Sequence, residues 1–199
     1  MRIGLDLDNT LICYDQAFLE VGKDEGLLPA SFRGNKTAVK RALLAERPDG
    51  LLWQTLQGLV YGRRIDAAVL FEGVPDFLAL CRERGADVLV VSHKTELAHH
   101  DPLSTNLRQA ALGWMERRGL FGAAALERHN VHFEATREDK VRRIGALGCE
   151  LFVDDLAEVL TDGGMPGGCR RILFGNEPHD GLERCPTWRD VSDAVFLSR

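Results

Sequence analysis

Apolar residues in the second half of this chain form short continuous runs, separated by stretches in which they recur every three or four positions. The run Ala86–Ser92 is almost entirely apolar, which is typical of a parallel strand buried on both faces. Shorter runs at Asn130–Glu134, Leu151–Val153 and Arg171–Phe174 predict further strands. Because strand and helix patterns alternate, we expect an α/β fold built on a doubly wound parallel sheet.

Helical periodicity separates these strands. We expect helices over Val74–Arg84, Asn106–Arg118, Arg137–Leu147 and Leu156–Leu160. A glycine follows the apolar pattern of each of the first three, as is common where a helix ends.

Residues 13–72 do not follow this alternation. They read as three or four helices joined by turns that contain Pro and Gly, near Gln16–Glu25, Thr37–Ala45, Leu51–Tyr61 and Ile65. We therefore expect a Rossmann-like core of residues 1–12 and 73–199, with a helical cap of residues 13–72 inserted after the first strand. Such a cap would form a lid over the carboxyl end of that strand. Its own core is expected to include Phe18, Trp53 and Tyr61.

The amino-acid composition limits the partners and the cellular locations that we expect for this protein. The 199 residues are 45% hydrophobic and 28% charged, with a formal charge of −5 that argues against a nucleic-acid partner. The five cysteines are widely spaced and form no CxxC pair, so we expect reduced thiols. No secretory signal or membrane span is evident, so we expect a cytoplasmic protein without a membrane partner. The oligomeric state is not predicted.

Two acidic residues follow the first predicted strand. Ile3, Leu5 and Leu7 alternate with other residues, and Asp6 and Asp8 also occupy alternate positions near the end of the run. Two close carboxylates without a basic neighbour repel each other unless a cation or a proton intervenes. The pattern favours a metal site, and the alternative is an Asx-type turn with a helix N-cap.

Further chemically active side chains follow the other strands. Ser92 ends the second strand, Lys140 lies near the start of the helix after the third, and Asp154-Asp155 ends the fourth. Because the carboxyl ends of parallel strands share one edge of a sheet, we expect these residues to converge with Asp6 and Asp8. The structural alternatives are that Ser92 caps a helix, that Lys140 faces solvent, and that Asp155 caps the helix after it.

This order of features resembles the haloacid dehalogenase superfamily over essentially the whole chain. The DxDxT motif of that family matches Asp6–Thr10, its hydroxyl motif matches Ser92, its lysine motif Lys140, and its acidic motif Asp154-Asp155. The insertion after the first motif resembles the family's helical cap of the first type. The resemblance implies the fold of that superfamily and a phosphatase activity.

Phosphoryl transfer requires a nucleophile, screening of the phosphate oxygens and a proton for the leaving group. Asp6 would be the nucleophile and would form an aspartyl-phosphate. Mg²⁺ would be held by the Asp6 carboxylate, the Asp8 backbone carbonyl and Asp154. The Asp8 side chain would protonate the departing alkoxide and then accept a proton from water.

The remaining candidates surround the phosphate. Lys140 and the Ser92 hydroxyl would hold its oxygens. Asp155 would lie outside the direct ligands of the metal, where it would orient a water ligand or balance the charge of Lys140. Asn9, His93 and Lys94 are the candidate substrate contacts.

We therefore expect a Mg²⁺-dependent phosphatase acting on a small phosphorylated metabolite. A likeness of 92–102 and the Asp154-Asp155 region to family members of bacterial surface-polysaccharide biosynthesis implies a sugar, polyol or amino-alcohol phosphate. A nucleoside monophosphate phosphatase and a phosphomutase remain open, as does a phosphonate hydrolase using Lys23, Lys36 or Lys40. The non-enzyme alternative is a metal-binding regulatory protein that retains the fold.

Overall fold

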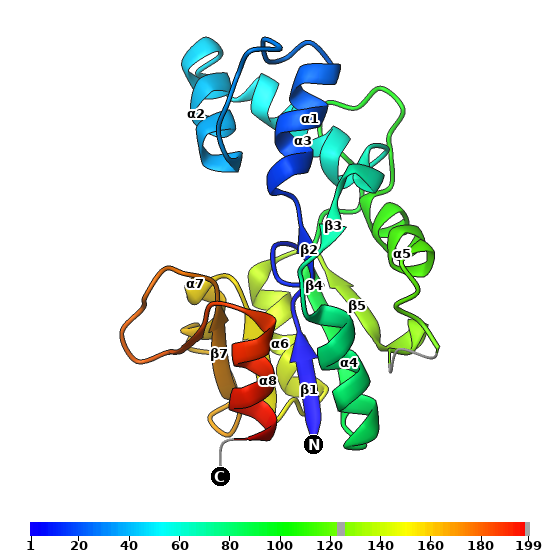
Figure 1. The fold of residues 1–199 in the computed structure, drawn as a ribbon, viewed down its shortest axis with the longest axis vertical. Helices are drawn as coiled ribbons and strands as arrows, with labels where there is room; N and C mark the ends of the chain where they lie inside the picture. Colours follow the sequence, from blue (N-terminus) through cyan, green and yellow to red (C-terminus); the bar gives the residue numbers. More distant parts are fainter. Residues whose placement is uncertain (123–125, 198–199) are drawn as a thin grey trace. The chain divides into compact units, whose positions relative to one another are not determined.

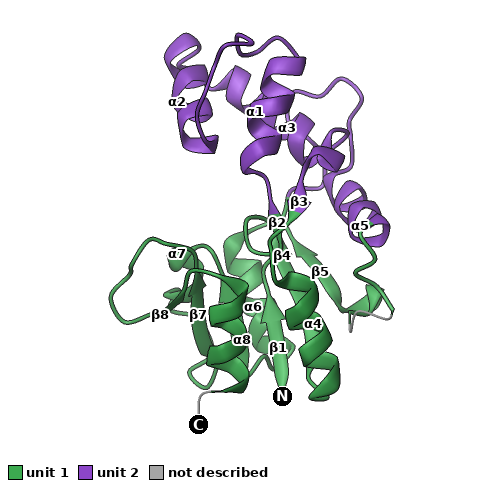
Figure 2. Ribbon diagram, viewed as in Figure 1, with its two compact units in different colours: residues 1–12, 70–94, 118–199 green, residues 13–69, 95–117 purple. Residues whose placement is uncertain are grey.

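The computed structural model describes residues 1–122 and 126–197. Clustering of contacts divides the chain into two compact units, coloured separately in Figure 2. The first comprises residues 1–12, 70–94 and 118–199, and the second comprises residues 13–69 and 95–117. The segment 95–117 thus belongs to the same unit as the helical insertion, whereas it was expected to belong to the core.

The first unit contains a six-stranded sheet in the order β5-β4-β1-β6-β7-β8, in which every neighbouring pair is parallel (Figure 1). Its strands are β1 (Arg2–Leu5), β4 (Asp87–His93), β5 (Val131–Glu134), β6 (Leu151–Asp154), β7 (Arg170–Phe174) and β8 (Glu183–Cys185). The doubly wound parallel sheet is confirmed.

Four α-helices accompany the sheet, namely α4 (Val74–Glu83), α6 (Arg137–Ala146), α7 (Ala157–Leu160) and α8 (Trp188–Phe196). A 3₁₀ turn, η2 (Arg128–Asn130), precedes β5. β8 and α8 are additions to the predicted elements. A capping box formed by Thr187 and Asp190 begins α8. None of the helices within the described residues is both long and apolar enough to cross a membrane.

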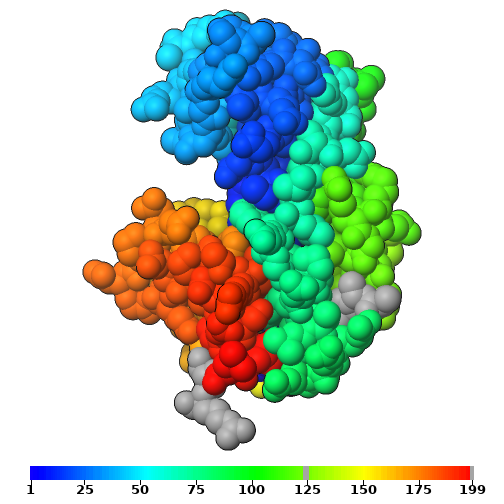
Figure 3. Space-filling view, in the orientation of Figure 1, coloured from blue at the N-terminus to red at the C-terminus, as the bar shows by residue number. Residues whose placement is uncertain are grey.

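Alternate residues of the strands face opposite helical layers. Leu89 and Leu173 belong to the apolar cluster beneath α6 and α7. Phe174, one position further along β7, packs against Trp188 of α8, which also contacts Phe77 of α4. Figures 1 and 3 show α4 and α8 side by side on this face. Both faces of the sheet are therefore buried, which explains the continuous apolar runs.

The position of β1 in the sheet indicates where a ligand would bind. From β1 the sheet extends through β4 and β5 in one direction and through β6, β7 and β8 in the other. The winding thus reverses at β1, and the crevice at the carboxyl end of such a strand is the usual ligand site of an open α/β sheet. Asp6 is the first residue after β1, and its backbone N–H donates to the Val153 carbonyl at 2.9 Å.

The second unit is mainly helical. It contains α1 (Asp15–Asp24), α2 (Lys36–Glu46), α3 (Leu51–Tyr61), the 3₁₀ turn η1 (Ile65–Ala67) and α5 (Leu107–Arg117). The short strands β2 (Ile12–Cys13) and β3 (Val69–Leu70) pair where the chain passes between the units. Phe18 stacks on Trp53 at 5.0 Å and contacts Tyr61 edge-on, so these aromatic residues pack together as expected.

Candidate active site

Lys140 joins two of the predicted acidic residues. Its side chain is fully buried, and its Nζ lies 2.5 Å from Asp6 Oδ1 and 2.7 Å from Asp154 Oδ2. The Thr136 side chain, which accepts the Asp139 N–H, begins α6 so that Lys140 follows in the first turn. The three charged groups come from the ends of β1 and β6 and from α6. Burial excludes the alternative in which Lys140 faces solvent.

Burial and charge oppose each other in this group. Burial raises the pKa of Asp154 and the negative charge of Asp6 raises it further, to about 7, although Lys140 acts in the other direction. Burial lowers the pKa of Lys140, but Asp6 and Asp154 outweigh it, so the pKa lies above that of free lysine. Lys140 is therefore a cation at neutral pH, whereas Asp154 titrates near neutral pH and a further positive charge would favour its ionised form.

Thr10, the last residue of the first motif, holds Asp155 in place. The Thr10 hydroxyl accepts the backbone N–H of Asp155 at 3.2 Å and donates to its Oδ1 at 3.5 Å. The Thr10 carbonyl accepts the indole N–H of Trp188 at 3.0 Å. Asp155 does not cap α7, because Leu156 precedes that helix and its N–H is bound by Asp154 Oδ1. The ion pairs of Lys140 join it to Asp6 and Asp154, and the expected role of Asp155 in orienting water or balancing the charge of Lys140 remains a prediction.

Asp8 and Lys94 form a second ion pair. Lys94 Nζ lies 2.6 Å from Asp8 Oδ2, and the two side chains are 3% and 20% exposed. Sequence reasoning placed both residues in the site but did not predict that they pair. Asn9 has a left-handed φ of 62° and donates its N–H to the Ile12 carbonyl, so it forms the turn after Asp8. Its predicted contact with substrate remains a prediction.

Ser92 and His93 are the last two residues of β4, the strand beside β1. Ser92 is 1% exposed and lies opposite Phe133 of β5, so it does not cap a helix. Burial lowers the pKa of His93, and the positive charge of Lys140 lowers it further, so the imidazole is neutral at pH 7. Its Nδ1 is buried and makes no hydrogen bond among the described residues.

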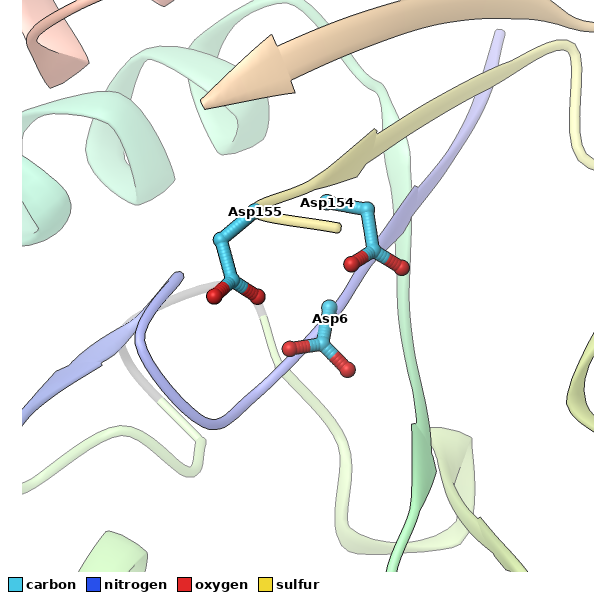
Figure 4. A group of neighbouring side chains, drawn as sticks. All are labelled: Asp6, Asp154 and Asp155. Atoms are coloured by element: carbon cyan, nitrogen blue, oxygen red, sulfur yellow. The ribbon is translucent and has the colours of Figure 1, made fainter. Parts of the chain in front are cut away.

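The three acidic residues at the ends of β1 and β6 fit a metal ion. One carboxylate oxygen from each of Asp6, Asp154 and Asp155 lies within 4.8 Å of the others, and Figure 4 shows the three carboxylates near one another. Carboxylate oxygens are ligands preferred by hard divalent cations. Asp154 Oδ2 is buried and, despite its ion pair with Lys140, has no well-directed hydrogen bond.

The charge balance supports the same conclusion. The group contains two ammonium groups and four carboxylates, those of Lys94, Lys140, Asp6, Asp8, Asp154 and Asp155. With all four carboxyl groups ionised, this largely buried region carries an excess of two negative charges, which one divalent cation would neutralise.

Solved structures with the same fold were found, although no protein-family model matches the sequence and no curated protein matches it. Protein tyrosine kinase A from Mycobacterium tuberculosis superposes with a TM-score of 0.67 at 15% identity, covering 98% of this chain and 97% of that chain. A HAD-superfamily hydrolase, subfamily IA, variant 1, from Geobacter sulfurreducens gives 0.62 at 14% identity, covering 98% and 95%. A HAD family hydrolase from Deinococcus radiodurans, with bound phosphate and sodium, gives 0.56 at 16% identity, covering 98% and 94%. This chain therefore has the fold of the haloacid dehalogenase superfamily hydrolases, as the motifs implied.

Proposed function

We propose that this protein is a Mg²⁺-dependent phosphatase that hydrolyses a small phosphate monoester through an aspartyl-phosphate on Asp6. One observation carries the proposal: Asp6 follows the central strand in contact with Lys140 and within 4.8 Å of carboxylate oxygens of Asp154 and Asp155. A lone metal site would not require a buried lysine beside the acids. A site for phosphoryl transfer requires both, because an anionic nucleophile must approach an anionic phosphate.

The reaction has two steps. An Asp6 oxygen attacks phosphorus as the bond to the leaving oxygen breaks, and the proton of Asp8 passes to that oxygen to give the free alcohol. A water molecule then attacks phosphorus, Asp8 takes one of its protons, and Asp6 is released with inorganic phosphate. Lys140 and Ser92 contact the phosphate oxygens. Asp6, Asp154 and the Asp8 carbonyl would hold Mg²⁺, which would offset the repulsion between nucleophile and phosphate, and Asp155 would orient a water ligand or balance the charge of Lys140.

The fold relatives supply partial support for this reading. The Deinococcus radiodurans hydrolase binds phosphate, which is the product of the proposed reaction. The Mycobacterium tuberculosis structure is described as a tyrosine kinase, so the acceptor of the phosphoryl group is the point to test. We propose water as the acceptor because Asp8 provides a carboxylate that can activate it.

The substrate is proposed from the resemblance of the sequence. A sugar, polyol or amino-alcohol phosphate, bound through Asn9 and His93, matches the likeness to proteins of surface-polysaccharide synthesis. A cytoplasmic location with no nucleic-acid or membrane partner belongs to the same proposal.

A substrate panel tests the function. We expect inorganic phosphate to be released from one or a few small monoesters, with at least about 100-fold loss when Mg²⁺ is removed by a chelator. Transfer of phosphate within a sugar instead of release would identify a phosphomutase. Trapping of substrate by borohydride would identify a phosphonate hydrolase. Magnesium binding without turnover of any monoester would favour the regulatory protein.

Magnesium binding is expected to strengthen as pH rises from 6 to 8. The pKa of Asp154 is raised to about 7, so its carboxyl is mostly protonated at pH 6 and must lose a proton to bind the ion. Affinity should increase about tenfold over this interval and then level off. Calorimetry in buffers of different ionisation enthalpy would measure both the affinity and the proton released.

The Asp154→Asn variant is the matched control, because an amide does not titrate. Its weaker binding should change little with pH. Wild-type affinity that is constant from pH 6 to 8 would contradict the proposed coupling.

A further inference from the structure

Lys94 is oriented toward the protein interior, where it meets the acid of the first motif. Its side chain is 3% exposed, and its Nζ contacts Asp8 Oδ2 at 2.6 Å. The sequence indicated a substrate contact for Lys94, and that contact remains a prediction. In this structure the ammonium group lies against the carboxylate of Asp8.

The backbones of both partners are fixed independently of the ion pair. The Lys94 N–H donates to the Glu134 carbonyl at 2.9 Å, which extends the pairing of β4 with β5 by one residue. Asp8 forms a bridge with Ile12 in the turn after β1. Because neither backbone is free to shift, the ion pair restricts the rotation of the Asp8 carboxyl group.

We propose that Lys94 is the positioning residue for Asp8, selecting which carboxyl oxygen exchanges the proton. This inference rests on the proposed phosphatase function. Because Oδ2 is in contact with the ammonium group of Lys94, Oδ1 is the oxygen that exchanges the proton with the leaving group. When the bond from phosphorus to the leaving oxygen breaks, the Oδ1 proton passes to that oxygen. The carboxylate that remains on Asp8 is stabilised by the ammonium group of Lys94.

The nature of the leaving group separates this role from binding of phosphate. An alkoxide is a strong base and requires a proton as it leaves, whereas p-nitrophenolate leaves without one. Loss of acid catalysis therefore slows an alkyl phosphate much more than p-nitrophenyl phosphate. A lysine that held the phosphoryl group would affect both esters equally, because they carry the same group.

The test measures kcat/KM of Lys94→Met with both esters, using the best alkyl phosphate of the panel. This constant covers the steps up to formation of the aspartyl-phosphate, where the acid acts. We expect the ratio of the alkyl value to the p-nitrophenyl value to fall about tenfold or more. The ratio does not depend on how much of the variant folds, because inactive protein lowers both values alike. Lys94→Arg keeps a cation beside Asp8 and should restore most of the ratio.

A double variant tests whether Lys94 acts through Asp8. Asp8→Asn alone should lower the same ratio, and adding Lys94→Met should lower it no further, because the group being positioned is already absent. An unchanged ratio in Lys94→Met, or losses that multiply in the double variant, would overturn the proposal. Failure of the phosphatase function itself would be seen separately, as absence of phosphate release from either ester by the wild-type protein.

Discussion

The Asp6→Asn variant is expected to lose phosphate release by at least about 10³-fold while remaining folded. An amide cannot serve as the nucleophile, although its oxygen still occupies the position next to Lys140. The ion pair of Lys140 with Asp154 would persist, since it involves a different carboxylate. Steady-state release of inorganic phosphate measures the loss, and thermal unfolding checks the fold.

Acid quenching with labelled substrate provides the second measurement. Label should remain covalently attached to the wild-type protein and be absent from Asp6→Asn. The matched control is Asp180→Asn, which makes the same change at an exposed position in the first unit. Appreciable turnover by Asp6→Asn, or undiminished capture of label, would remove Asp6 from the mechanism.

Asp154→Asn is expected to weaken Mg²⁺ binding about 100-fold and to lower turnover about 10³-fold. Asp154 is fully buried, receives the Leu156 N–H on Oδ1 and contacts Lys140 through Oδ2. Asparagine retains a single oxygen, so either the backbone contact or the contact with Lys140 is replaced by opposed donors. Calorimetric titration with Mg²⁺ measures the first effect, and phosphate release at saturating Mg²⁺ measures the second.

The Asp155→Asn variant allows the loss of Mg²⁺ affinity to be compared between the two neighbouring carboxylates. Its side chain is held by Thr10 and lies outside the ion pairs of Lys140, so the loss of Mg²⁺ affinity should be smaller than for Asp154→Asn. Equal effects at the two positions would argue that both ligate the metal directly. A larger loss of Mg²⁺ affinity in Asp155→Asn than in Asp154→Asn would indicate that Asp155, and not Asp154, is the direct metal ligand.

The element order could be predicted from the sequence because each strand and helix produces a local pattern. The apolar run near Ala86 predicted β4, and the observed strand differs by one residue at each end. The last strand left no comparable signal, whereas Trp188, Val191 and Val195 of the last helix recur at helical spacing, a pattern that was missed. β8 has three residues, of which only Cys185 is buried, and this is too short for a periodicity to appear. The capping pair of Thr187 and Asp190 was a second sign of α8.

The extent of the helical insertion could not be predicted from local sequence patterns either. Helix α5 was predicted nearly to the residue, but the segment 95–117 clusters with the insertion and not with the sheet. Periodicity identifies which face of a helix is apolar and does not identify the surface against which that face packs.

For the candidate site, the sequence by itself determined which residues follow the strands of the sheet, because parallel strands place their carboxyl ends at one edge. Only the tertiary structure decided how the charges pair. Lys140 meets Asp6 across 134 positions of sequence, and Lys94 meets Asp8. Such pairings depend on strand register and side-chain direction between distant segments, and these are fixed only when the whole sheet has assembled.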